Sequence, residues 1–220
     1  MRELTGDEKL ILMRSPLFKG MTEERLCHAL SFYKAKIRHY EKGEFIKRTT
    51  DSMNFFGFVL SGVVQVYMDE LDGSHMVMAT VETGRSFGES LCFLRKESPI
   101  YICAAVPSEI LCLDCVNLSN ARGEEECDIL LRFTSMLAQR TLMMNERIQI
   151  LSKLSIREKL KTMFSEYPGA SSGKTFEIPL SREDMAAYLG TDRSALSREL
   201  SKMKKEGIID YYKNSFRIIG

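Results

Sequence analysis

The chain has 220 residues, of which 44% are hydrophobic, enough for packed cores in one large or two modest domains. A formal net charge of +1 gives no sign of a nucleic-acid partner, and the composition excludes a disordered or fibrous protein. No apolar run approaches the roughly 18 residues of a membrane-spanning helix, and charges interrupt the first residues, MRELTGDEKLILMRSPLF, unlike a signal peptide. We therefore expect a cytoplasmic protein without membrane contacts, whose six cysteines are reduced, buried thiols.

The first part of the chain predicts helix and then short strands. Residues 5–32 are predicted to be helical, with Thr22 as the N-cap of the second part of that region. From about residue 34 to 116, runs rich in β-forming residues alternate with turn signals, among them Asp72-Gly73, a hairpin signal. Short, closely spaced strands are typical of a small antiparallel barrel or jelly roll. We expect an α+β protein whose first domain covers residues 1–123.

A long helix is predicted over residues 124–152, because no Gly or Pro interrupts the chain from Glu124 to Tyr167. Leucine or methionine recurs at every seventh position, with Thr or Ile at the alternate positions, a heptad pattern typical of paired helices. The alternative is a helix that packs on its own barrel, which requires one apolar stripe. We expect a homodimer whose interface contains Leu130, Leu137, Met144, Ile148 and Leu151.

The last domain, residues 153–220, is predicted to be a winged helix-turn-helix. After a helix and the loop YPGASSGK, the segment TFEIPL predicts a strand, and IIDYYKNSFRII predicts two strands around a polar turn, the wing. Between them lie two helices separated by Gly190, the first capped by Ser181 and the second by Thr191 or Asp192. A helix, a tight glycine turn and a second helix form the motif whose second helix enters the major groove of DNA.

The second helix of this motif has two contrasting sides at about 100° per residue. Leu196, Leu200 and Met203 share a narrow sector that we expect to face the domain core. The opposite side carries small hydroxyl residues around a guanidinium, which let a helix approach a groove and match the acceptors of guanine. The alternative, a merely solvated side, typically carries long side chains of mixed charge. The predicted DNA-binding residues are Arg193, Ser194, Ser197, Arg198, Ser201, Lys202 and, at the wing tip, Lys213.

Four segments in this order, EKGEFI, FGFVLSGVVQVY, TGRSFGE and LSREDMAAYLGTDRSALSREL, resemble the CRP/FNR superfamily of bacterial transcription regulators. The resemblance covers essentially the whole chain. It implies a cyclic-nucleotide-binding-like jelly roll, a long dimerisation helix and a C-terminal winged helix-turn-helix, with double-stranded DNA and RNA polymerase as partners. Arg193 and Arg198 match the two arginines that the cyclic-AMP branch uses on DNA, with Ser194 in place of a glutamate between them. Ser197 and Arg198 match the Ser-Arg pair of the FNR branch.

The sensor segment departs from the family pattern. Gly88-Glu89 matches the start of the cassette that holds a cyclic nucleotide, but Pro99-Ile100 replaces its phosphate-binding Arg-Ser. The Thr-Ser pair that contacts adenine is also absent from the long helix. A cyclic phosphate would lack its counter-charge, so we expect a small-molecule effector other than cyclic AMP. The candidate effector-binding residues are Gly88, Glu89, Tyr101, Arg140, Met144 and Asn145.

No cofactor, metal site or catalytic residue is assigned from the sequence. An iron–sulfur cluster of the FNR type needs several cysteines near the N-terminus, where the sequence has Cys27. Cys112 and Cys115 have a metal or redox spacing, but on a strand they would point to opposite faces, so a structural role is favoured. The three histidines are scattered and select no haem site. No nucleophile–base pair or phosphate-binding glycine loop indicates an enzyme.

These observations predict a homodimeric, sequence-specific DNA-binding transcription regulator, controlled by an unidentified effector in the jelly roll. The alternative is a small-molecule or redox sensor whose C-terminal domain binds a protein partner in place of DNA. Salt dependence separates the two, because DNA binding weakens steeply as salt is raised.

Overall fold

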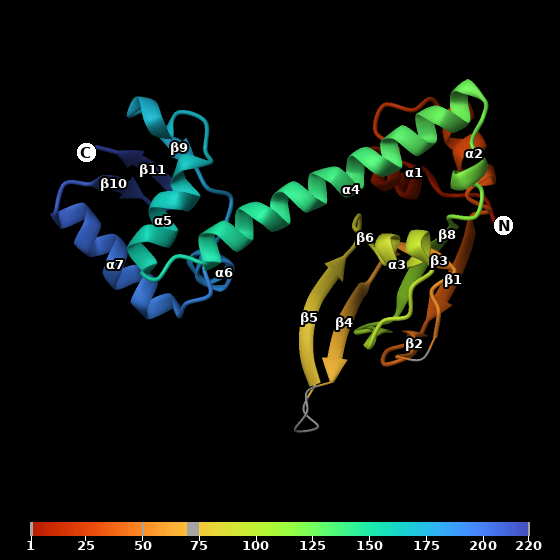
Figure 1. Ribbon diagram of the computed structural model, residues 1–220, viewed down its shortest axis with the longest axis horizontal. Coiled ribbons are helices and arrows are strands. Elements are labelled where there is room, and N and C mark those ends of the chain that lie inside the picture. The colour runs from red at the N-terminus through yellow and green to blue at the C-terminus, as the bar shows by residue number, and fades with distance from the viewer. Residues whose placement is uncertain (1, 50, 70–74, 220) are drawn as a thin grey trace. The chain divides into compact units, whose positions relative to one another are not determined.

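The structure is a computed structural model that describes residues 2–49, 51–69 and 75–219 (Figure 1). The chain forms two compact units, Met1–Ala138 and Gln139–Gly220, with the boundary inside helix α4 (Glu124–Leu151). This helix agrees with the predicted one to within one residue. Among the described residues, no helix combines the length and the apolar character that crossing a bilayer requires.

The first unit begins with two helices, α1 (Gly6–Arg14) and α2 (Glu23–Phe32). Thr5 accepts a hydrogen bond from the Glu8 amide and Thr22 accepts one from the Arg25 amide, so the predicted cap at Thr22 is confirmed. The predicted helical region 5–32 is interrupted between these helices. Pro16 lies in the break, and Gly20 adopts a left-handed φ of +74°, which ends the intervening turn.

Among the described residues of this unit, eight antiparallel strands form two four-stranded sheets, so the predicted β-rich domain is confirmed. The first sheet has the order β1 (Lys36–Tyr40), β8 (Ser108–Asp114), β3 (Phe55–Ser61) and β6 (Ser86–Phe87). The second has the order β2 (Phe45–Lys47), β7 (Ile100–Ala104), β4 (Val63–Asp69) and β5 (His75–Glu82). The predicted turn Asp72-Gly73 lies outside the described residues, but the strands on either side of it, β4 and β5, pair as a hairpin would require.

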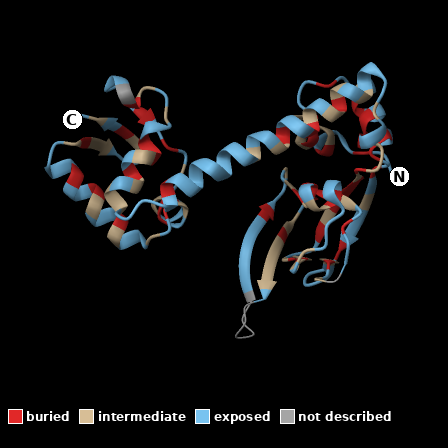
Figure 2. Ribbon diagram, viewed as in Figure 1, coloured by how far each residue is buried: buried red, intermediate tan, exposed pale blue. Residues whose placement is uncertain are grey.

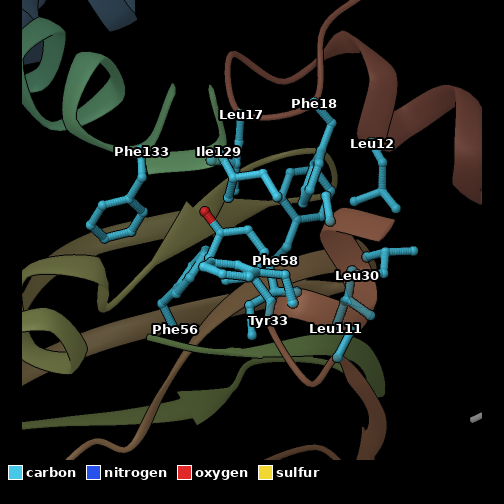
Figure 3. Packing of buried hydrophobic residues seen from close by; sticks show 14 of the residues in the cluster. Leu12, Leu17, Phe18, Leu30, Tyr33, Phe56, Phe58, Leu111, Ile129 and Phe133 are labelled. Atoms are coloured by element: carbon cyan, nitrogen blue, oxygen red, sulfur yellow. The ribbon is translucent and has the colours of Figure 1, made fainter. Parts of the chain in front are cut away.

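Two apolar cores stabilise this unit. One core contains Val59, Val64, Phe87 and Ile102 from strands of both sheets. The second joins α1, α2 and the first sheet to the first half of α4, and Figure 3 shows its packed side chains. Aromatic rings connect its parts: the ring centroid of Phe56 lies 5.5 Å from that of Tyr33 and 5.6 Å from that of Phe133 on α4. Such aromatic contacts tie α4 to the first sheet.

A short helix, α3 (Glu89–Leu94), follows β6, and a 3-10 turn (Leu118–Asn120) follows β8. Gly88 caps α3 with a φ of +80°, a conformation that favours glycine. The thioether of Met53 occupies the space beside it, since a Cβ on Gly88 would lie 2.4 Å from Met53 Cε. The backbone conformation therefore favours glycine at this position, and a larger residue would also have to displace the end of the Met53 side chain.

The second unit has the predicted order of helices and strands. Its elements after α4 are α5 (Ile156–Ser165), a 3-10 turn (Ala170–Ser172), β9 (Phe176–Glu177), α6 (Arg182–Tyr188), α7 (Arg193–Lys205), β10 (Ile209–Tyr212) and β11 (Ser215–Ile218). The three strands form one antiparallel sheet in the order β10-β11-β9. The segment TFEIPL contributes Phe176 and Glu177 to it as β9, and the Ile178 amide also donates to the Asn214 carbonyl at 2.9 Å.

Local capping explains where the helices of this unit begin. Ser155 forms a capping box with Glu158 at α5, and Ser181 accepts from the Asp184 amide at α6. Of the two candidates for the cap of α7, the structure selects Asp192. Ile150 at the end of α4 packs in the core of this unit with Leu160, Leu196 and Phe216.

Candidate nucleic-acid interface and effector site

Helix α7 separates buried from exposed residues as the sequence predicts (Figure 2). Leu196, Leu200 and Met203 are fully buried in the core of the second unit. The predicted DNA-binding residues all lie exposed on α7 or in the turn of the wing: Arg193, Ser194, Ser197, Arg198, Ser201, Lys202 and Lys213. None of them is packed inward, so the exposed side of α7 is available to a partner.

The two arginines on this side carry free guanidinium groups. Among the described residues, neither Arg193 nor Arg198 makes a hydrogen bond or an ion pair. An exposed guanidinium presents a planar fork of donors that fits two acceptors of one guanine or one phosphate. The pair therefore supplies two binding groups that the fold itself does not use.

Two of the serine hydroxyls on the same side already donate hydrogen bonds within the protein. The Ser194 hydroxyl donates to Asp192 Oδ1 at 2.6 Å, and the Ser201 hydroxyl donates to the Ser197 carbonyl at 2.9 Å. The Ser194 hydroxyl and the Ala195 amide lower the pKa of the Asp192 carboxyl, which stays ionised as the helix cap. Ser194 and Ser201 can thus act as acceptors toward DNA while their protons remain engaged.

A cluster of charges that the sequence did not reveal connects α5 to α7. Arg157 Nε donates to Glu199 Oε1 at 2.6 Å, and its terminal nitrogens donate to the two oxygens of Glu206 at 2.7 and 3.2 Å. Glu206 and Glu199 raise the pKa of the guanidinium, and Arg157 lowers the pKa of Glu206. One planar group is thereby bonded to Glu199 within α7 and to Glu206 at its C-terminal end.

The turn between α6 and α7 is closely packed. Lys159 Nζ donates to the Leu189 carbonyl at 2.9 Å. Gly190 has a φ of +60°, and a Cβ on it would lie 3.1 Å from Leu151 Cδ2. Glycine is therefore needed at this turn for its conformation and for the close approach.

Arg182 holds the wing in place. It donates to the Lys213 carbonyl at the tip at 2.5 Å, and its guanidinium lies 5.3 Å from the Tyr211 ring and 5.0 Å from the Phe216 ring. Burial lowers the pKa of Arg182, consistent with its packing against the sheet. Lys213 itself adopts a φ of +50°, which directs the turn of the hairpin.

The candidate effector residues fall into separate places. Gly88 and Glu89 lie at the start of α3, where Glu89 is buried. Tyr101 lies on β7, on the opposite face from the buried Ile102, and stacks on the Tyr67 ring at 5.1 Å. The structure thus does not bring Tyr101 together with Gly88 and Glu89. The remaining candidates belong to the second unit: Arg140 is half-buried, and Met144 and Asn145 are exposed on α4.

A buried lysine occupies the region where the resemblance expects a phosphate site. Lys47 Nζ donates to the carbonyls of Arg48, Ser98 and Ile100 at 2.8, 3.1 and 3.0 Å. These bonds use all three protons of the ammonium group, and burial lowers the pKa of Lys47. The loop before β7 is therefore held by an ammonium that has no proton left for an anionic ligand.

The expectation of six buried thiols is wrong for Cys27 and Cys127, which lie exposed on helices near the surface of the first unit. Cys112 packs in the core between the two sheets, whereas Cys115 packs in the core under α4. The two thiols of the CxxC spacing therefore lie in different cores. Cys115 instead belongs to the same buried cluster as Cys92 of α3, and its proximity lowers the pKa of Cys92. Within the described residues, no group of three His, Cys, Asp or Glu side chains could hold a metal ion.

The predicted dimer seam is split between buried and exposed positions. Leu130 and Leu137 pack partly against the core of the first unit. Met144, Ile148 and Leu151 are exposed within the second unit, as are Leu142 and Met143 beside them. The second half of α4, which Figure 2 draws as mostly exposed, therefore carries an exposed apolar stripe formed by Met144, Ile148 and Leu151.

Comparison with known proteins finds two matching family models, a cyclic nucleotide-binding domain over residues 37–122 and a Crp-like helix-turn-helix domain over residues 138–219. The cyclic AMP receptor protein of Thermus thermophilus is 25% identical over 203 residues, covering 89% of this chain and 88% of that protein. The transcriptional activator FnrL of Cereibacter sphaeroides is 23% identical over 189 residues, covering 78% and 71%. The crystal structure of the Thermus thermophilus catabolite activator protein matches with a TM-score of 0.54 at 25% identity and 93% coverage of both chains.

Proposed function

The chain belongs to the CRP/FNR superfamily of DNA-binding transcription regulators, and from this we propose that it acts as a homodimer controlled by an effector other than cyclic AMP. Its architecture is the cyclic nucleotide-binding-like sensor domain, the long helix and the helix-turn-helix of that family. The members of the family are regulators and not enzymes.

The observation that carries the proposed DNA contact is the pair of unengaged guanidinium groups of Arg193 and Arg198, opposite the buried ridge of α7. We assign Arg198 to base reading, because it lies beside the small residues Ser194, Ser197 and Ser201, which let the helix backbone approach the groove. The exposed ammonium of Lys202 contributes charge toward phosphates, and Lys213 does so from the wing.

The exposed apolar stripe of α4 supports the homodimer. A second copy of the same helix would remove this stripe from water through coiled-coil packing. Two recognition helices would then read two half-sites about one helical turn apart on the DNA. Any change in the pairing of the two α4 helices would alter that spacing. A change in the sensor domain would in this way affect DNA binding and the contact with RNA polymerase.

Two features of the sensor argue for an effector other than cyclic AMP. The Lys47 ammonium is already saturated by three carbonyls, so it supplies no proton to a phosphate. Met53 lies directly against Gly88, the first residue of the family's ligand cassette. An unpaired phosphate placed in this apolar surrounding would lose its hydration without compensation.

The test begins with selection of a palindromic binding site from random DNA, followed by gel-shift titration of wild type and Arg198→Ala. Loss of a bidentate base contact should cost about 1–3 kcal/mol per half-site, and the preference at one base position should relax. Lys202→Ala should instead weaken binding to all DNA sequences to a similar degree and reduce the salt dependence of binding.

Lys174→Ala, which removes an exposed charge from the same unit outside α7 and the wing, serves as the control. If Arg198→Ala left the affinity and the base preference unchanged, Arg198 would not be the residue that recognises the base. Failure of the wild type to bind any DNA, together with salt-insensitive capture of a protein, would favour the alternative of a protein partner.

A further inference from the structure

Two thiols from separate elements meet in the core beneath α4. Cys92 lies on α3 and Cys115 follows the last residue of β8, and both are almost completely buried, with exposures of 3% and 8%. Both thiols belong to the same buried cluster, and the thiol and backbone amide of Cys115 lie close enough to lower the pKa of Cys92. No function described above uses either side chain.

The two thiols differ in the direction in which the pKa is shifted. The proximity of Cys115 lowers the pKa of Cys92, while the same contact and burial raise the pKa of Cys115. Burial also raises the pKa of Cys103, and raises that of Cys112 to about 12. The thiolate is the reactive form of cysteine, so Cys92 is favoured as a nucleophile over these neighbours.

The surroundings suit an oxidised intermediate. The Tyr33 hydroxyl is fully buried in the same core and has no hydrogen-bond partner among the described residues. Burial raises the pKa of Tyr33, and the nearby Cys115 and Cys92 add to this rise. An oxygen added to a neighbouring sulfur would offer this orphaned donor an acceptor.

We propose that Cys92 and Cys115 form a peroxide-sensitive dithiol that closes to a disulfide. The Cys92 thiolate attacks the O–O bond of hydrogen peroxide, which yields a sulfenic acid and, after proton uptake, one water. The Cys115 thiol then attacks the Cys92 sulfur, forming the S–S bond and releasing the hydroxyl group as a second water. Two thiols and one peroxide are consumed, and one disulfide and two waters are produced.

The disulfide has a direct route to α4. Its sulfurs lie about 2 Å apart, closer than any hydrogen-bonded pair, so its formation draws α3 toward the end of β8. Phe93, next to Cys92, contacts Phe133 of α4 with ring centroids 5.5 Å apart. Phe133 in turn contacts Phe56 of β3. A shift of α3 therefore changes the packing that holds the long helix, and this consequence rests on the proposed regulator function.

The test uses the full chain, first reduced and freed of reductant, then treated with a few equivalents of hydrogen peroxide and alkylated. Intact mass should show two protected thiols, restored by dithiothreitol. Trypsin separates Cys92, in residues 86–95, from Cys103, Cys112 and Cys115, in residues 97–122. Non-reducing mapping should recover these two peptides joined.

Two variants identify the second sulfur. Cys115→Ser should abolish the cross-link, whereas Cys112→Ser, equally buried three residues away but in the other core, should retain it. Circular dichroism checks that each variant folds. If a variant does not fold, the non-reducing peptide map of the oxidised wild type alone identifies the two joined cysteines. A cross-link that survives in Cys115→Ser, joins two chains through Cys27 or Cys127, or fails to form would overturn the proposal.

DNA binding then tests the consequence. The cross-linked wild type should differ at least fivefold in affinity for the selected palindrome from the reduced protein, and peroxide should not change the affinity of Cys115→Ser. Equal affinity of the two wild-type forms would overturn the signalling role. Failure of the reduced protein to bind DNA would count against the proposed function instead, because the cross-link itself is measured without DNA.

Discussion

Two acidic substitutions on the exposed stripe of α4 should convert the protein to a monomer. Met144 is 64% exposed and Ile148 is 60% exposed in the single chain. Full burial of such a side chain stabilises by about 1.5–3 kcal/mol, so the exposed share of each is worth about 1–2 kcal/mol. A symmetric dimer contains each residue twice, which gives about 4–7 kcal/mol for the four side chains. Replacing both residues by aspartate removes this stabilisation of the dimer. The introduced carboxylates of the two chains would also repel each other.

The loss corresponds to a dimer dissociation constant raised by about 10³–10⁵-fold, since about 1.4 kcal/mol is a factor of ten. Sedimentation equilibrium of Met144→Asp/Ile148→Asp should therefore give the 25.2 kDa monomer, where the wild type gives twice that mass. Leu137 is a poorer target, because it also packs in the core of its own chain.

Gln139→Asp is the matched control. It is exposed on the same helix, about 140–180° around the axis from both substituted positions, and it should remain dimeric. A double variant that stays dimeric at micromolar concentration would refute pairing through this stripe.

Three further predictions concern stability. Leu200→Ala should lower the unfolding free energy by about 2–5 kcal/mol in urea titrations followed by circular dichroism, because it opens a cavity at a fully buried position, while Ser201→Ala should change it by less than about 0.5 kcal/mol. Lys47→Met should lower it by about 1–3 kcal/mol, since three partly buried carbonyls lose their donor; an unchanged thermal midpoint would contradict this. Arg2 lowers the pKa of Glu8 to about 2 from an ordinary value of 4.5, so stability present above about pH 4.5 is lost as the pH falls toward 2, and Glu8→Gln should lose less between those values.

The sequence predicts well those features that depend on residues close together in the chain. The caps at Thr22, Ser181 and Asp192 follow from a side chain and the amide three residues later. The two sides of α7 follow from the period of its apolar residues. In each case the information lies within one or two helical turns, which is why sequence reasoning is sufficient.

The features that it misses depend on contacts between distant segments. Arg157 reaches Glu199 and Glu206 across more than forty residues, and nothing in their spacing indicates it. Cys92 and Cys115 meet because α3 folds back beside the end of β8, although the CxxC spacing draws attention to another pair. The same limit applies to Tyr101, which shares its stretch of sequence with Gly88 and Glu89 but lies on the other face of its sheet.

The pairing of β1 with β8 has a consequence for synthesis of the chain. Lys36 pairs with Cys112 and Tyr40 with Ser108, so the first strand has no neighbour in its sheet until the last has been made. Contacts between such distant residues fold slowly, while the locally connected helices of the C-terminal unit should form quickly. Between these events the nascent sensor presents unpaired apolar strands, the kind of surface that attracts chaperones or aggregates. The yield of native protein should therefore depend more on temperature and translation speed than on the stability of the finished fold.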